Sequence, residues 1–453
     1  MNESDIYVGL DIGTTSIKVI VAQYVDGQVN VIGVGNEESA GVNRGIIVDI
    51  DKAAQAIKKT VSQAETKSGF EISRVIVGLP ADKIAISNCS GMINLDDSTK
   101  EINNQDIANV ARAAISNNIP QESELIDLIP SEFKIDGFDQ IPDPRGMLGS
   151  HLELEGRIIT GPKTVVHNVK KAVSRAGLKL DLVVVNAEAE GKTILSEPEQ
   201  DFGTIMIDIG GGQSTAAIIH NQELKYIDVD HEGGQFITKD ISAVLSTSLK
   251  DAENIKREYG FADVEQASPE NVFGVDVVGQ SQPLKINEKL LAEIIEARLD
   301  QIFNRLKDKL VSANALDMPG GIVLTGGVAS MQGIAELAAN TFGVNVRVYI
   351  PDKMGLRHPS FSSALSLVNY ASQLSEIKRV VRSAFDEDFY LAEDTNVDSS
   401  DDFEPMQENS QPSENDEEEN ESDGGGLFAS FRRNKQDKSK KKGSGFALKN
   451  FFE

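Results

Sequence analysis

Two stretches of the chain combine the residue types that bind phosphate. Each consists of an apolar run, a turn rich in glycine and in hydroxyl or amide side chains, and a second apolar run; they cover residues 8–22 and 205–219. Glycine allows consecutive backbone N–H groups to converge on phosphate oxygens. Asp11 and Asp208 end the two first runs, where a carboxylate suits Mg²⁺ held through its water shell. Either stretch alone could be an ordinary hairpin with a glycine-rich turn, but two in the same register predict a clamp for one nucleotide.

A later pair of glycines is expected to complete this nucleotide site. The apolar run 322–325 ends at Gly326-Gly327, and a helix is expected over 332–342. A glycine pair between a strand and a helix lets a base or ribose lie against the backbone, near the positive potential of the helix N-terminus. The predicted nucleotide contacts are Asp11, Gly13, Thr14, Thr15, Lys18, Asp208, Gly210, Gly211, Gly212, Gln213, Gly233, Gly234, Lys239, Gly326 and Gly327.

The elements between these stretches follow an α/β pattern. The first hairpin is followed by a third extended run, by a helix that Asp51 could cap and Gly69 could end, and by a buried strand over 74–79. This is half of a doubly wound α/β lobe. The pattern resumes after residue 161, and the second hairpin opens a second lobe. Between residues 84 and 161, short extended pieces surround one helix candidate, which predicts a small α+β insert in the first lobe.

A long helix is expected over 286–310 in the second lobe. Its apolar residues alternate spacings of three and four, which predicts a buried stripe. Arg298, Arg305 and Lys309 lie off that stripe, and the simplest interpretation of these cations is a solvated helix face.

Composition excludes several classes of protein. The chain has 453 residues, enough for two sizeable lobes. Cys89 is its one cysteine, so no internal disulfide can form, which favours a reducing cytosolic compartment. The start of the chain is polar and acidic, unlike a signal peptide, and no apolar run approaches the length of a membrane span. A net charge of −27 argues against nonspecific binding of nucleic acid.

The C-terminal tail reverses its charge along its length. Residues 386–423 contain seventeen Asp and Glu and no Lys or Arg, so this segment cannot bury a core and is expected to be disordered. The last thirty residues contain eight Lys and Arg, with two aromatic clusters that each form an apolar face on a helical wheel, although Phe446 falls off the second face.

Aromatic faces beside basic residues are typical of helices that lie in the headgroup layer of an anionic bilayer. Each cluster is too small to anchor the chain alone, so the two would act by avidity. The alternative is a terminus that binds a protein partner. The predicted membrane contacts are Leu427, Phe428, Phe431, Arg432, Arg433, Phe446, Leu448, Phe451 and Phe452.

These features together resemble the actin/Hsp70/sugar-kinase superfamily, in which two related lobes hold ATP through two phosphate hairpins and a later Gly-Gly turn. Within it the chain is similar to the FtsA family of bacterial cell-division proteins. The resemblance covers about residues 5–375. The segments that carry it are 9–19, 45–51, 77–80, 143–147 and 320–327.

The resemblance implies an actin-like bilobed α/β fold with two ribonuclease-H-like lobes and a disordered C-terminal tail. The first lobe would comprise 1–83 and 162–200, with the insert at 84–161. The second lobe would comprise a core and an outer part that binds the tubulin-like protein FtsZ. The remaining ranges are 201–240 and 313–385 for that core, 241–312 for the outer part, 386–426 for the acidic linker and 427–453 for the membrane-targeting segment.

The resemblance also implies partners and a location. The protein would bind ATP and Mg²⁺, polymerise through the insert, and tie FtsZ and other division proteins to the cytoplasmic face of the cell membrane at the septum. Arg298 and Arg305 would belong to the FtsZ-binding face by their position on the long helix.

One residue departs from the ATP-hydrolysing relatives. In those relatives, the strand that joins the lobes ends in a group that positions the attacking water. The matching residue in this chain is Asn186, which could orient water but could not act as a base. Slow or absent hydrolysis is therefore expected. Three other functions use the same fold: a small-molecule kinase, an Hsp70-like chaperone, and a membrane-anchored scaffold of pilus or cell-shape machinery. A kinase needs a general base in the cleft, and no residue stands out as one.

Overall fold

The computed structural model describes residues 6–95, 101–116 and 119–385. These residues lie in one compact unit, Met1–Ala392. The acidic linker and the membrane-targeting segment predicted for the tail lie outside the described residues. Among the described residues, no helix combines the length and apolar character needed to cross a bilayer.

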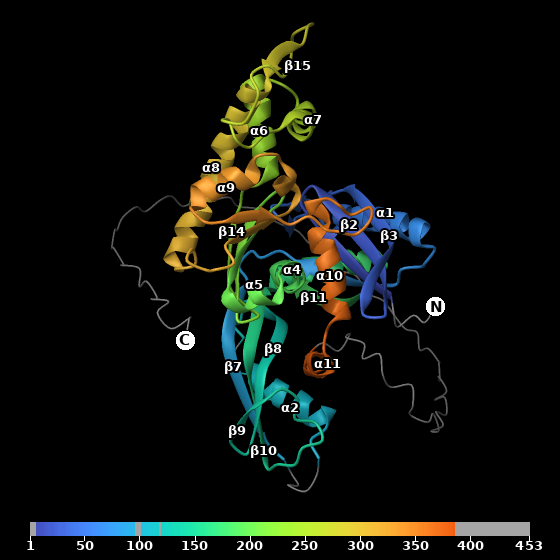
Figure 1. Ribbon diagram of the computed structural model, residues 1–453. Helices are drawn as coiled ribbons and strands as arrows, with labels where there is room; N and C mark the ends of the chain where they lie inside the picture. Colours follow the sequence, from blue (N-terminus) through green and yellow to red (C-terminus); the bar gives the residue numbers. More distant parts are fainter. Residues whose placement is uncertain (1–5, 96–100, 117–118, 386–453) are drawn as a thin grey trace, which may run out of the picture. The chain divides into compact units, whose positions relative to one another are not determined.

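Two five-stranded sheets repeat one topology, which confirms the two-lobed α/β fold (Figure 1). In each, a three-stranded antiparallel meander is extended by two parallel strands, so the order β3-β2-β1-β6-β11 matches β14-β13-β12-β17-β18. The first sheet consists of β1 (Ile6–Ile12), β2 (Ser16–Val25), β3 (Gln28–Glu38), β6 (Arg74–Leu79) and β11 (Lys179–Val185). The second consists of β12 (Thr204–Ile209), β13 (Ser214–His220), β14 (Glu223–Asp230), β17 (Ile322–Thr325) and β18 (Val346–Val348).

Helices cover both faces of the first sheet. α1 (Ile50–Ser68) and α3 (Lys163–Arg175) bury their apolar residues in one core with the central strands. α10 (Ser362–Ser372) packs on the other face. α4 (Asn186–Ile194) contributes Ala187 and Ile194 to the first core and Ala189 to the core beneath α10. A Cβ on Gly9 would lie 2.5 Å from the Ala364 carbonyl oxygen, so glycine is what allows α10 to approach β1 closely.

The capping prediction for α1 is half right. The N-cap is Asp49, whose carboxylate accepts from the Lys52 N–H, and Asp51 lies inside the first turn. Gly69 ends the helix in the left-handed conformation, as predicted.

The insert is a four-stranded antiparallel sheet with one helix on it. Its strands are longer than the short pieces expected from the sequence. The sheet order is β7-β10-β8-β9, and α2 packs on β7 and β10. The bounds are β7 (Ala85–Asn94), α2 (Asn104–Ile115), β8 (Ser123–Ile135), β9 (Phe138–Ile141) and β10 (His151–Pro162).

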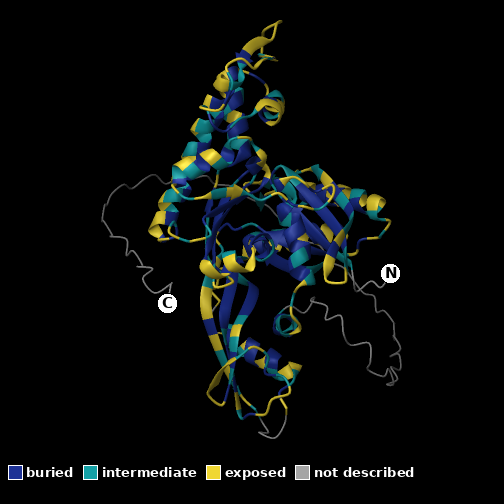
Figure 2. Cartoon of the chain, in the orientation of Figure 1, coloured by how far each residue is buried: buried dark blue, intermediate teal, exposed yellow. Residues whose placement is uncertain are grey.

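The outer part of the second lobe is built on α8 (Glu288–Ser312), whose predicted apolar stripe is buried. α6 (Gly234–Leu245) and α7 (Leu249–Tyr259) pack beside α8, and a short hairpin, β15 (Val272–Val275) and β16 (Leu284–Asn287), leads into it. Figure 2 shows that burial is concentrated on the central strands of the sheets, whereas the β15–β16 hairpin is largely exposed. The remaining elements are β4 (Val42–Asn43), β5 (Ile46–Ile47), α5 (Glu197–Phe202), the 3-10 turns η2 (Gly327–Ser330) and η3 (Pro359–Phe361), and α9 (Ile334–Phe342).

The last described helix, α11 (Glu376–Ser383), packs against the insert and the first lobe. Arg382 is only 2% exposed. Its guanidinium donates to the Asp127 carboxylate at 3.1 Å and to the carbonyl oxygens of Ile126 at 3.0 Å and Val183 at 2.6 Å. One buried arginine therefore joins α11 to β8 of the insert and to β11 of the first lobe.

Candidate functional site

The turns of the two glycine-rich hairpins line one cavity of about 110 Å³. They approach each other so closely that side chains would not fit at two glycines. A Cβ on Gly211 would lie 2.5 Å from Thr15 Cγ2, and one on Gly212 would lie 2.5 Å from Thr14 Oγ1. Backbone N–H groups can therefore approach a ligand from both lobes, as a phosphate clamp requires.

The carboxyl groups of Asp11 and Asp208 line this cavity, and a third carboxyl group, that of the buried Glu190, lies close to them. Burial raises the pKa of Asp11, although Lys18 and Asn186 lower it in part. Burial, and then the charge of Asp11, raise the pKa of Asp208 to about 7. Burial and the charge of Asp208 raise the pKa of Glu190 on α4 well above its ordinary value. Because these groups oppose one another's ionisation, a bound cation would stabilise their charged forms.

Two polar side chains complete the cavity wall. Lys18 lies opposite Asp11 in the β1–β2 register, and its Nζ is 3.8 Å from the Asp11 carboxylate. Asn186 is the first residue of α4, and its Oδ1 is buried without a hydrogen-bond partner among the described residues. A Cβ on Gly78 would lie 1.8 Å from that oxygen, so β6 holds the Asn186 amide closely in place. The amide oxygen can accept a hydrogen bond from water but cannot take its proton.

A second cavity of about 400 Å³ adjoins the first, since Thr15, Lys18, Gly211 and Gly327 line both. This volume lies in the range of small-molecule sites, roughly 300–1,000 Å³. The second cavity continues the cleft past the Gly326-Gly327 turn, where a nucleoside was expected.

The sequence interpretation missed the contribution of α7 to this second cavity. Glu253, Lys256 and Arg257 of that helix line it. Lys256 is buried, and its Nζ donates to Glu253 Oε2 at 2.6 Å and to the Gly234 carbonyl oxygen at 3.0 Å. The available signal was a lysine on the buried face of an amphipathic helix, next to Ile255. Asn36 of β3, His358 and Ser360 of η3 were also missed, because no motif marks them.

Most of the predicted nucleotide residues line these cavities, and two do not. Lys239 lies over the ring of Phe236, with Nζ 4.8 Å from the ring centroid, and Gly233 packs behind the second hairpin. Gly234 borders only the second cavity. The predicted nucleotide residues that line the first cavity are Asp11, Gly13, Thr14, Thr15, Lys18, Asp208, Gly210, Gly211, Gly212, Gln213, Gly326 and Gly327.

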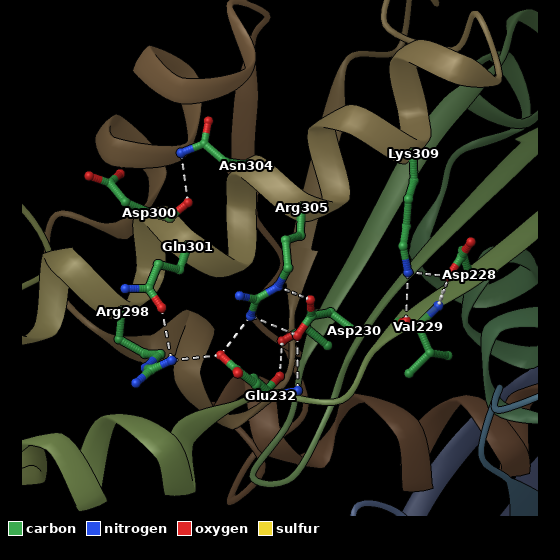
Figure 3. Close-up of polar contacts among 11 residues, drawn as sticks. Asp228, Val229, Asp230, Glu232, Arg298, Asp300, Gln301, Asn304, Arg305 and Lys309 are labelled. Atoms are coloured by element: carbon green, nitrogen blue, oxygen red, sulfur yellow. Dashed lines mark hydrogen bonds and ion pairs between the residues drawn. The ribbon is translucent and has the colours of Figure 1, made fainter. Parts of the chain in front are cut away.

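The cations of α8 that lie off its apolar stripe are held by carboxylates of the second lobe (Figure 3). Arg298 bonds Asp240 and Glu232, and Arg305 bonds Asp230 and Glu232. The side chain of Arg298 is only 19% exposed, so a freely solvated face is the wrong description of it.

The residues of the cleft fit a Mg²⁺-nucleotide. Glycines leave room for phosphate at both hairpins, the carboxyl cluster favours a cation, and the oxygens of Asn186 and Gln213 are buried without a partner among the described residues. A hydrated cation or a ligand with hydrogen-bond donors would satisfy those oxygens.

The duplicated sheets with a cleft between them define an actin-like fold. The structure is similar to that of the PilM-PilN type IV pilus biogenesis complex (TM-score 0.57, 18% identity, covering 81% of this chain and 99% of that one). It is also similar to the structure of MreB5 of Spiroplasma citri bound to ADP (TM-score 0.51, 14% identity, covering 84% and 99%). At these identities the likeness shows the fold alone.

Sequence comparison then gives the family. A family model described as "Cell division protein FtsA" matches residues 205–366, and one described as "SHS2 domain inserted in FTSA" matches 81–160. The chain is 51% identical over 397 residues to the cell division protein FtsA of Enterococcus hirae, covering 88% of this chain and 90% of that protein. The chain belongs to the FtsA family of cell-division proteins.

Proposed function

We propose that this protein binds ATP, polymerises, and tethers FtsZ filaments to the cytoplasmic face of the cell membrane at the division septum. The observation that carries the proposal is the pair of glycine hairpins from two duplicated lobes that line one cavity. Such a clamp binds a nucleotide most tightly when the lobes are at one particular angle, so occupancy would set the lobe angle and the readiness to polymerise.

The nucleotide would lie with its phosphates between the two hairpins. Asp11 and Asp208 would hold Mg²⁺ through water, and the nucleoside would occupy the second cavity beside Lys256 and Gly327. The Spiroplasma citri MreB5 structure, which has the same fold, is bound to ADP, and this supports a nucleotide here.

Hydrolysis would be slow. In the cavity, Asn186 stands where a water-positioning group is needed, and an amide cannot act as a general base. We expect a turnover below about one per second, the low end of the usual enzyme range. ATP would act as a ligand that controls assembly and not as a fuel consumed at each step.

The assembly surfaces follow from the family and the sequence. The insert, residues 84–161, would contact the next copy, and the outer part of the second lobe, residues 241–312, would bind FtsZ. The ion pairs of Arg298 and Arg305 to their own lobe support a role in shaping that surface, with exposed parts of the side chains left for contact. The segment 427–453 would bind anionic lipid.

A pilus-type membrane scaffold is the nearest alternative function, because the PilM-PilN complex shares the fold. Membership of the FtsA family favours cell division over that alternative.

The experiment that tests the tether is co-sedimentation of FtsZ with anionic liposomes, using the full chain and a chain ending at Asp423. We expect FtsZ to pellet with the full chain and to stay in solution with the shortened one. Equal pelleting with both chains would overturn the tether.

A further inference from the structure

The turn that leads from β14 into the first residues of α6, residues 232–235, is bonded directly to the second phosphate hairpin. The Gly234 N–H donates to the Gly210 carbonyl oxygen at 2.9 Å, and the Gln235 N–H donates to the Gly211 carbonyl oxygen at 2.8 Å. These two carbonyls belong to the glycines that line the phosphate end of the cleft. A shift of the 232–235 turn therefore shifts the backbone that would hold phosphate.

Two further contacts leave little room between this turn and the hairpin. The Ser214 hydroxyl donates to the Glu232 carbonyl oxygen at 2.8 Å. A Cβ on Gly233 would lie 2.4 Å from the Gly210 carbonyl oxygen, so the two backbones are in direct contact. The turn and the hairpin behave as one packed unit.

The side chain of Glu232 leaves this unit and points to α8 (Figure 3). Its Oε2 accepts from Arg298 Nη1 at 2.9 Å and from Arg305 Nη2 at 2.6 Å. The two arginines are seven residues apart on the helix, so they lie on one face of it. A single carboxylate thus connects the turn to two positions on α8 that are about two helical turns apart.

The arginines are themselves fixed from both sides. Arg298 donates through Nε and Nη2 to the Asp240 carboxylate of α6 at 2.6 and 2.9 Å. Arg305 donates through Nη2 to Asp230 at the end of β14 at 3.1 Å, and its Nε contacts the same carboxylate. Glu232 is 24% exposed and Asp230 7% exposed. Bidentate, partly buried ion pairs in a network are stronger and more directional than isolated ion pairs on the surface.

The same helix offers a comparison pair that does not reach the turn. Lys309 Nζ bonds the Asp228 carboxylate at 2.5 Å and the Val229 carbonyl oxygen at 2.8 Å. Both partners lie on strand β14, before the turn. Loss of this pair removes a similar contact between α8 and β14 without touching residues 232–235.

We propose that Glu232, held by Arg298 and Arg305, is a positioning residue that fixes the glycine turn and the second phosphate hairpin for the nucleotide, and thereby couples α8 to nucleotide binding. The inference rests on the proposed nucleotide site. Coupling of this kind is reciprocal. A partner that moves α8 changes nucleotide affinity, and nucleotide changes the affinity for that partner by the same factor.

The test compares Glu232→Gln, Arg305→Met and the control Lys309→Met in the full chain. Mg²⁺-ATP affinity is measured by calorimetry. Loss of hydrogen bonds to a charged group corresponds to about tenfold or more in an equilibrium constant. We expect about that loss of affinity for Glu232→Gln and Arg305→Met, and less than about twofold for Lys309→Met. The double variant Glu232→Gln/Arg305→Met is expected to lose less Mg²⁺-ATP affinity than the product of the two single fold-losses, since both substitutions remove the same Glu232–Arg305 contact.

Amide hydrogen exchange without nucleotide gives a second, independent readout. Glu232→Gln is expected to speed exchange at the amides of Gly234 and Gln235, and Lys309→Met is not. Unchanged amide exchange together with unchanged Mg²⁺-ATP affinity in Glu232→Gln would overturn this inference but not the proposed nucleotide site. A natural chain that binds no nucleotide would overturn the proposed site, and the exchange result would still decide whether Glu232 holds the turn.

Discussion

The substitution Gly326→Ala tests the geometry of the metal end of the cleft. Gly326 has a φ of 90°, and a Cβ there would lie 2.1 Å from Asp208 Oδ1 and 2.6 Å from the Ile209 carbonyl oxygen. Gly343→Ala is the control for a positive φ without a collision, since that residue has a φ of 78° and nothing within 4 Å of its Cβ. Gly343 is left-handed, where alanine costs about 1–2 kcal/mol, whereas Gly326, with a ψ of 169°, lies in a region essentially restricted to glycine, where alanine costs about 1–3 kcal/mol. Only Gly326→Ala also has the collision, which costs about 1–3 kcal/mol more when a well-packed region is overfilled.

Two measurements read out this difference. Urea unfolding followed by circular dichroism is expected to show a free energy of unfolding about 1–3 kcal/mol lower for Gly326→Ala than for Gly343→Ala. Displacing the Asp208 carboxylate is expected to weaken Mg²⁺-ATP binding about tenfold to a hundredfold, the usual effect of disturbing groups around a metal. Gly343→Ala is expected to bind normally. If the two variants match in both stability and binding, Gly326 does not set the position of Asp208, and the description of the site is wrong.

Three further predictions address other parts of the molecule. Arg382→Met leaves the buried Asp127 carboxylate without its cation and is expected to lower the free energy of unfolding by about 3–5 kcal/mol, measured by urea unfolding. The double variant Arg382→Met/Asp127→Asn is expected to recover much of that loss, because it removes the unpaired charge. Burial, and then Asp11, raise the pKa of Asp208 to about 7, so Mg²⁺-nucleotide affinity is expected to rise from about pH 6 to about pH 8 as the carboxyl ionises. In the metal-free protein the same group stabilises the fold fully below its unfolded pKa of about 3.9, and this contribution is lost as the pH rises through about 7, which acid-to-neutral thermal melts would detect. Phe428→Glu and Phe451→Glu are each expected to weaken liposome sedimentation and together to abolish it, because each cluster buries side chains worth at most several kcal/mol.

Local patterns predicted much of the fold. The two hairpins are short, and each contains its own strand periodicity and turn glycines, so both sheets could be expected from residues 8–22 and 205–219. The stripe of α8 was equally local, because helical spacing alone places Leu299 and Leu306 on one buried face.

Features that depend on distant residues could not be predicted. Arg298 and Arg305 looked like solvated cations because their carboxylates lie 58 and 75 residues earlier in the chain. Lys256 lines the cleft only because α7 packs against α6, and no sequence motif marks this lysine. The cap of α1 was misplaced by two residues because Asp49 and Asp51 are both good caps, and the turn before the helix decides between them.

The central claim is that the cleft between the lobes holds one Mg²⁺-ATP. Calorimetric titration of the full chain with ATP, with and without Mg²⁺, tests it most directly, alongside Gly212→Val, whose side chain would occupy the space beside Thr14. We expect one site per chain, tighter binding with Mg²⁺ than without, and no binding by the variant. No binding by the natural chain, or equal binding by the variant, would contradict the claim.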